Sequence, residues 1–140
     1  MMMMITMILV VLCRVREVNG CEILNNQELI HYVDQWISNS TNHPCGEVIG
    51  DWDVSNVTDM SYVFCGCSSG EYNSSFNGNI SGWDTSSVTS LLSTFEYATS
   101  FNGDLSGWNT SSVTSLYNTF DGATSFNGDL SGWDTSHVTS

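Results

Sequence analysis

The chain has 140 residues, of which 41% are hydrophobic and 11% aromatic, so it is long and apolar enough to form one domain with a buried core. Its 15 acidic residues stand against two basic ones, Arg14 and Arg16, and the formal net charge is −13. Because phosphate groups repel such a surface, this charge excludes nucleic acid as a partner and disfavours anionic membranes.

Residues 1–20, MMMMITMILVVLCRVREVNG, contain an apolar run from Met1 to Cys13 that is followed by both arginines. This run is too short to cross a hydrocarbon layer of ~30 Å, which takes about 20 residues. We therefore predict a secretory leader cleaved before Cys21, no transmembrane span, and an extracellular or cell-surface location. A mispredicted start and a bacterial lipid anchor on Cys21 are the alternatives.

Residues 21–48 are predicted to form an N-terminal capping helix and a loop. In NNQELIHYVDQWIS, the apolar residues Leu29, Val33 and Ile37 recur at helical intervals. Asn25 and Glu28 have the spacing of a capping box at the start of this helix. A helix with one apolar stripe needs a surface to cover.

Four cysteines remain once the leader is removed: Cys21, Cys45, Cys65 and Cys67. Four cysteines allow two disulfides in three pairings. Cys65 and Cys67 are separated by one residue, so we expect them to pair with Cys21 and Cys45 and not with each other. Zinc binding by the four thiols is the alternative, which the Cys-x-Cys spacing supports only weakly. We predict no metal and no cofactor.

Residues 49–140 form a repeat array with a period of 25 residues. Trp52, Trp83, Trp108 and Trp133 are separated by 31, 25 and 25 residues, so the first unit carries an insertion of six. The units start near residues 49, 80, 105 and 130, and the last is incomplete. Other apolar positions keep the same register around each tryptophan: Ile49, Ile80, Leu105 and Leu130 before it, Val57, Val88, Val113 and Val138 after it, then Phe64, Phe95 and Phe120.

Each unit is predicted to contain one short helix and one short strand. The apolar spacing in SVTSLLSTFEYA favours the helix, and the segment around Leu105 and Trp108 favours a strand that bends at Gly107, so that both side chains point inward. A unit of this size cannot bury its own apolar face, so equivalent side chains of successive units should stack. Propeller blades have about 40 residues, which a period of 25 excludes.

The stretches DWDVSNVTDMSYVF, GNISGWDTSSVTSLLSTF and FNGDLSGWDTSHVTS resemble the 25-residue units of BspA-like leucine-rich-repeat surface proteins, a group that includes mycoplasma lipoproteins. The resemblance covers roughly residues 27–140. It implies an α/β fold, a right-handed leucine-rich-repeat-like solenoid that is exported or displayed at a surface and used for attachment or protein binding. Because Ser140 lies within a unit, we expect Trp133 and Val138 to be exposed. The alternatives are a fragment of a longer array and end-to-end self-association through the uncapped C-terminal coil.

Enzymatic chemistry has little support, because His31, His43 and His137 have no Ser or Cys partner in a recognisable motif and are expected at the surface. We predict a non-enzymatic recognition or adhesion module for a protein or glycan. Its binding face would lie on the strands and contain Asn79, Ser81, Asp104, Ser106, Asp129 and Ser131.

Three further interpretations remain open. Ranks of threonines could bind ice or a mineral surface, namely Thr85, Thr110 and Thr135 together with Thr89, Thr114 and Thr139. Asp84, Asp104, Asp129 and Asp134 could bind calcium, although aspartates near turns also accept backbone N–H groups. In a eukaryotic source, five sequons would be candidates for N-glycosylation, at Asn39, Asn56, Asn73, Asn79 and Asn109.

Overall fold

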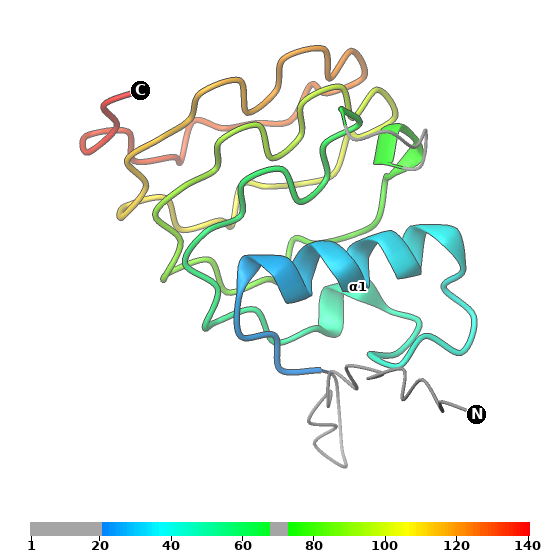
Figure 1. The fold of residues 1–140 in the computed structure, drawn as a ribbon. Helices are drawn as coiled ribbons and strands as arrows, with labels where there is room; N and C mark the ends of the chain where they lie inside the picture. The colour runs from blue at the N-terminus through cyan, green and yellow to red at the C-terminus, as the bar shows by residue number, and fades with distance from the viewer. Residues whose placement is uncertain (1–20, 68–72) are drawn as a thin grey trace, which may run out of the picture.

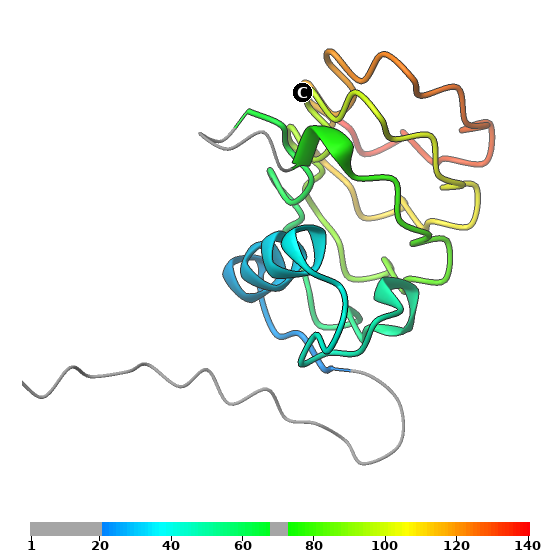
Figure 2. The same ribbon diagram turned by 90° about the vertical axis from the view of Figure 1, so that its right-hand side faces the viewer.

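The computed structural model describes residues 21–67 and 73–140, so the predicted leader lies outside the described residues. Its helical elements are α1 (Asn26–Ser38) and two short 3₁₀ helices, η1 (Ile49–Asp51) and η2 (Asn73–Ser75). The rest of the described chain winds in coils that stack away from α1 toward the C-terminus (Figures 1 and 2). We number the coils 1 to 4 by the tryptophan that each contains, from Trp52 to Trp133.

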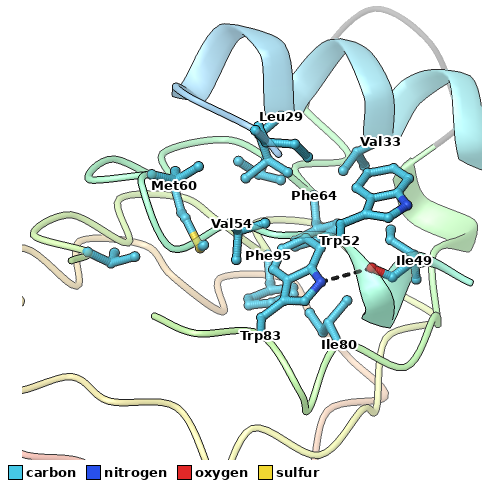
Figure 3. Packing of buried hydrophobic residues seen from close by; sticks show 14 of the residues in the cluster. Leu29, Val33, Ile49, Trp52, Val54, Met60, Phe64, Ile80, Trp83 and Phe95 are labelled. Atoms are coloured by element: carbon cyan, nitrogen blue, oxygen red, sulfur yellow. Dashed lines mark hydrogen bonds between the residues drawn. The ribbon is translucent and has the colours of Figure 1, made fainter. Parts of the chain in front are cut away.

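Helix α1 forms as predicted. The side chain of Asn25 accepts a hydrogen bond from the N–H of Glu28 at 3.0 Å, and the Glu28 carboxylate accepts one from the N–H of Leu24 at 3.0 Å, which satisfies two donors at the helix start. Leu29 and Val33 are buried against coil 1 (Figure 3). The helix therefore covers the N-terminal end of the core.

Equivalent aromatic rings stack on one another from coil to coil, as predicted. The rings of Phe64, Phe95 and Phe120 form one column, with centroids 5.1 and 5.4 Å apart. A second column, Phe76, Phe101 and Phe126, runs beside it with spacings of 5.7 and 5.8 Å. Each buried phenylalanine contributes roughly 1.5–3 kcal/mol through its loss of water contact. The two columns form the centre of the core.

The tryptophans form a third column. The rings of Trp52, Trp83 and Trp108 are stacked with centroids 6.5 and 6.4 Å apart. The indole N–H of Trp83 donates to the Ile49 carbonyl of the preceding coil at 2.9 Å (Figure 3). Trp108 and Trp133 repeat this bond with the carbonyls of the preceding coil at 3.2 and 3.1 Å, so these three tryptophans keep the same register. The core is therefore built from equivalent positions of successive coils.

The predicted α/β leucine-rich-repeat-like solenoid, with a strand and a helix in each coil, is wrong. In the described residues, α1 is the one α-helix and no strand forms; three isolated parallel bridges occur instead, Glu22 with Asp53, Asp59 with Ser90, and Ser90 with Ser115. The coils thus consist almost entirely of turns and irregular backbone.

The predicted helix fails because its backbone donors bond to the next coil. Every second N–H in this part of coil 2 donates to coil 3: Leu91 to Ser115, Ser93 to Tyr117, Phe95 to Thr119 and Tyr97 to Asp121, at 2.7–3.0 Å. An α-helix would need these N–H groups for its own carbonyls. The residues between them turn back within the coil, and Ser93 and Tyr97 have φ values of 53° and 54°, so the segment is not an extended strand either.

The predicted strand is replaced by a tight turn. The N–H of Trp108 donates to the carbonyl of Leu105 at 3.0 Å, with the turn at Ser106 and Gly107. The predicted bend at Gly107 is confirmed, and Leu105 and Trp108 both point inward, with 1% and 3% of their surface exposed. Successive turns of this kind place an apolar residue inside the core at about every third position. This spacing resembles that of an amphipathic helix, which is why the amino-acid sequence predicted one.

Candidate functional site

The residues of the predicted binding face form a column of turns along the stack. The Asp104 side chain accepts a hydrogen bond from the N–H of Ser106 at 2.9 Å, and Asp129 accepts one from Ser131 at 2.9 Å. Asn79 makes the same turn with the N–H of Ser81 at 3.1 Å. We call these three turns the Asx column. The six predicted residues lie on these turns and not on strands, and their role as a binding face stays a prediction.

The two aspartates of the Asx column are exposed anions. Hydrogen bonds from the backbone and then the side chain of Ser106 hold the pKa of Asp104 below its usual value. Ser131 lowers the pKa of Asp129 in the same way, and the nearby negative charge of Asp104 partly opposes that shift. Both carboxylates are therefore charged at neutral pH, and they lie close enough for their negative charges to repel each other.

A second column of Asx turns follows the tryptophans. Asp84 and Asp134 accept from the N–H groups of Ser86 and Ser136 at 3.0 and 2.9 Å, and Asn109 takes the same place between them. Hydrogen bonds from the side chain and then the backbone of the serine lower the pKa of each aspartate. The backbone-capping alternative thus accounts for these aspartates.

In the described parts of the chain, the structure shows no cluster of three carboxylates that could bind calcium. The group of three ligating side chains found in residues 21–67 and 73–140 is Cys65, Cys67 and Glu96, whose ligand atoms lie within 4.8 Å of one another. Aspartates of the two Asx columns are not part of such a group. Their oxygens serve the turns instead.

The threonine ranks hold the coils together. Thr85 and Thr110 are buried, and each hydroxyl accepts from a backbone N–H of the next coil at 2.8 Å and donates to a carbonyl there at 3.2 Å. Thr89, Thr114 and Thr139 are exposed, but their hydroxyls donate to the preceding coil at 2.9–3.2 Å. These hydroxyl donors are thus occupied by the protein itself.

The cysteines pair differently from the prediction. Cys21 bonds to Cys45, and Cys65 bonds to Cys67. The expectation that Cys65 and Cys67 would pair with Cys21 and Cys45 is wrong. The Cys21 carbonyl accepts the N–H of Asp53 near the start of coil 1, whereas Gly66, between Cys65 and Cys67, donates to Glu96 of coil 2. Cys21 and Cys45 are buried, whereas Cys67 is exposed.

His43 is the histidine that the surface prediction misjudged, since His31 and His137 are exposed and His43 is only 7% exposed. Its ring stacks on Trp52 with centroids 5.1 Å apart and so ends the tryptophan column. Its Nδ1 lies 3.1 Å from the N–H of Cys45, and its Nε2 lies 3.1 Å from the carbonyl of Tyr32. Burial lowers the pKa of His43, which favours the neutral ring.

The sequons at Asn39, Asn56, Asn79 and Asn109 are exposed, and the side chain of Asn73 lies outside the described residues. Glycosylation at these positions stays a prediction. At the C-terminal end of the stack, Trp133 and Val138 are half-buried and not fully exposed. A hollow of about 360 Å³ opens there, lined in part by Leu116, Phe120, Leu130 and Trp133. End-to-end self-association through this coil also stays a prediction.

Three exposed tyrosines were not singled out from the sequence. Tyr62, Tyr97 and Tyr117 have 47%, 49% and 59% of their surface exposed. Tyr62 belongs to coil 1 and Tyr117 to coil 3, and their backbones are hydrogen-bonded to the adjacent coil 2 residues Leu92 and Ser93. Tyr62 and Tyr117 therefore lie on the same side of the stack. Their signal in the sequence was a break in the repeat, because Tyr62 aligns with Ser93 and Asn118.

Comparison with known proteins identifies a family match. The family described as "Mycoplasma protein of unknown function, DUF285" matches residues 33–140. No curated protein and no solved structure matches the chain. The family match agrees with the mycoplasma-type repeats that the sequence resembles, but it does not extend to the BspA-like group. In the described residues, no helix has the length and apolar character needed to cross a membrane.

Proposed function

Because the chain belongs to this Mycoplasma family of unknown function, we propose that it is a surface-displayed, non-enzymatic module that recognises or adheres to a protein or glycan ligand. The extracellular location is part of this proposal. It is supported by the two disulfides, which form and persist in oxidising surroundings.

The observation that carries the proposal is the Asx column. Its carboxylates repeat at the interval of the coils, and the turns of Ser106 and Ser131 hold them in position before any ligand arrives. A rigid array of charged groups loses little conformational freedom on binding and can meet a complementary surface at several points. Such a face suits cationic patches of a protein or hydroxyl-rich glycans.

The histidines support a non-enzymatic role. Both ring nitrogens of His43 contact backbone groups, and its ring lies between α1 and the tryptophan column. His31 lies in α1 and His137 in coil 4, and both are exposed. The side chain of Gln35 contacts His31, and that of Ser136 contacts His137. The Ser136 hydroxyl lies 3.2 Å from His137 Nδ1, but both side chains are exposed to solvent.

The test is a binding screen against glycans and cell surfaces with matched charge variants. Asp104→Asn combined with Asp129→Asn removes two charges but keeps the turn, because Asn79 makes the same turn naturally. We expect binding to fall at least about tenfold, with weaker dependence on salt.

The control is Asp84→Asn combined with Asp134→Asn, which removes the same charge from the other column and also keeps its turn, as Asn109 does. Binding should then change little. An equal loss in both variants, or no binding by the wild-type chain at high concentration, would contradict the proposal. Thermal hysteresis of the wild-type protein would instead favour the ice-binding alternative.

A further inference from the structure

We propose that Cys65, Cys67 and Glu96, once the Cys65–Cys67 disulfide is reduced, bind one thiophilic divalent cation of the zinc class. We call these three residues the Cys–Glu cluster. Their ligand atoms lie within 4.8 Å of one another, and Cys65 Sγ is 4.0 Å from Glu96 Oε2. Two thiolates and one carboxylate form a ligand set that suits a tetrahedral zinc ion whose fourth position is open to water.

Backbone contacts between coils 1 and 2 hold the residues of the cluster close to one another. Cys65 and Glu96 occupy the same place in coils 1 and 2, thirteen residues after Trp52 and Trp83. The N–H of Gly66 donates to the Glu96 carbonyl at 2.8 Å, directly beside the cluster. An added Cβ on Gly66 would lie 2.5 Å from the Tyr97 carbonyl, so the two coils are in close contact here. The separation of thiol and carboxylate is therefore set by the stacking of the coils.

Polar groups of the protein contact the ligand atoms of the cluster. The N–H of Cys67 donates to Cys65 Sγ at 3.1 Å, and an N–H directed at sulfur stabilises a thiolate. The Asn118 amide of coil 3 lies 3.5 Å from Glu96 Oε1, so the carboxylate is contacted on its other oxygen while Oε2 faces Cys65. Cys65 is 1% exposed, whereas Cys67 is exposed and gives a cation access from solvent.

Disulfide and metal use the same two sulfurs, so the cluster has two exclusive states. A dithiol reductant supplies two electrons and two protons, is itself oxidised to a disulfide, and leaves Cys65 and Cys67 as thiols. The cation then replaces the thiol protons, which are released to solvent. The bound metal would in turn slow reoxidation of the pair.

The experiment uses the full protein, treated with a dithiol under native conditions and freed of it by gel filtration without oxygen. Because Cys21 and Cys45 are 1% and 3% exposed, the Cys65–Cys67 bond should be reduced first, and alkylation followed by mass spectrometry verifies this. Cadmium ions are then added. We expect a thiolate-to-cadmium absorption band that saturates at one ion per chain, with proton release, and no band in the oxidised protein.

Three variants locate the site. Cys65→Ser combined with Cys67→Ser should abolish the band, and Glu96→Gln should weaken cadmium binding roughly tenfold or more. Asp121→Asn, at the same place in coil 3, is the matched control and should bind as the wild type does.

Near-ultraviolet circular dichroism of the stacked tryptophans shows whether each variant is folded. If the double variant does not fold, Cys67→Ser alone alters an exposed side chain and makes the same test. The proposal is overturned by a band that survives removal of the thiols, by equal affinities of Glu96→Gln and the wild type, or by no band in the reduced wild-type protein.

Discussion

At the scale of single residues, glycine marks points where the backbone of one coil meets that of the next. Gly50 lies in η1, and an added Cβ would be 2.7 Å from the Asn79 carbonyl oxygen of coil 2. Gly107 lies in the turn before Trp108, and an added Cβ there would be 3.6 Å from the Ser81 carbonyl oxygen, an ordinary contact. A methyl group can therefore be added at Gly107 without a clash, but not at Gly50.

We expect Gly50→Ala to destabilise the protein by about 1–3 kcal/mol, because a backbone carbonyl cannot move aside without separating coils 1 and 2. Gly107→Ala should change the free energy of unfolding by no more than about 0.5 kcal/mol. Urea unfolding followed by tryptophan fluorescence measures both values. Similar losses in the two variants would show that the close approach at Gly50 is not a constraint.

At the scale of the repeated elements, each coil completes the hydrogen bonds of its neighbour. The indole N–H groups of Trp83, Trp108 and Trp133 all donate to a carbonyl of the preceding coil. Trp52 belongs to coil 1, and its buried indole nitrogen has no partner in the described part of the chain. The His43 ring covers Trp52 but does not satisfy this donor.

Replacement of these two tryptophans by phenylalanine should therefore have unequal effects. Trp83→Phe removes one of the two donors of the Ile49 carbonyl, which keeps the backbone N–H of Trp52 at 3.3 Å, whereas Trp52→Phe removes an indole donor that is already unsatisfied. Both changes lose buried area, but we expect Trp83→Phe to be more destabilising by about 0.5–1.5 kcal/mol, the net contribution of one hydrogen bond. Chemical denaturation of the two variants checks this difference, and a larger loss for Trp52→Phe would contradict it.

At the scale of the whole molecule, acid should destabilise the fold through two sets of groups. Burial holds the pKa of His43 below its ordinary value, so between about pH 6.5 and that lower value the unfolded chain binds the proton more readily. Stability present above pH 6.5 is then lost as the pH falls. The lowered pKa values of Asp84, Asp104, Asp129 and Asp134 add a second loss, below about pH 3.9.

We expect the midpoint of thermal unfolding to fall in two steps as the pH is lowered from 7 to 3. His43→Gln should remove the upper step, because glutamine keeps polar atoms near the Tyr32 carbonyl and the Cys45 N–H but does not titrate. The exposed His31 provides the control, since His31→Gln should leave the upper step in place. Loss of that step with His31→Gln alone would contradict the assignment to His43.

The surface is predicted less completely than the core. The turn-forming role of the aspartates could be anticipated, because Asp followed two residues later by Ser is a local signal. The exposure of Tyr62 and Tyr117 depends on which positions each coil turns outward, and that pattern follows from bonds to residues of another coil. The burial of His43 depends likewise on its position over Trp52.

The amino-acid sequence alone determined the period of 25 residues, the helix that begins after Asn25, and the alignment of Trp on Trp and Phe on Phe. These features follow from which side chains must leave water, and that information is present in the spacing of apolar residues. Only the tertiary structure decided that the coils contain turns in place of strands and helices, and which cysteines pair. Apolar spacing does not say where backbone N–H and C=O groups bond; here they bond to the neighbouring coil, which exists only once the chain has folded.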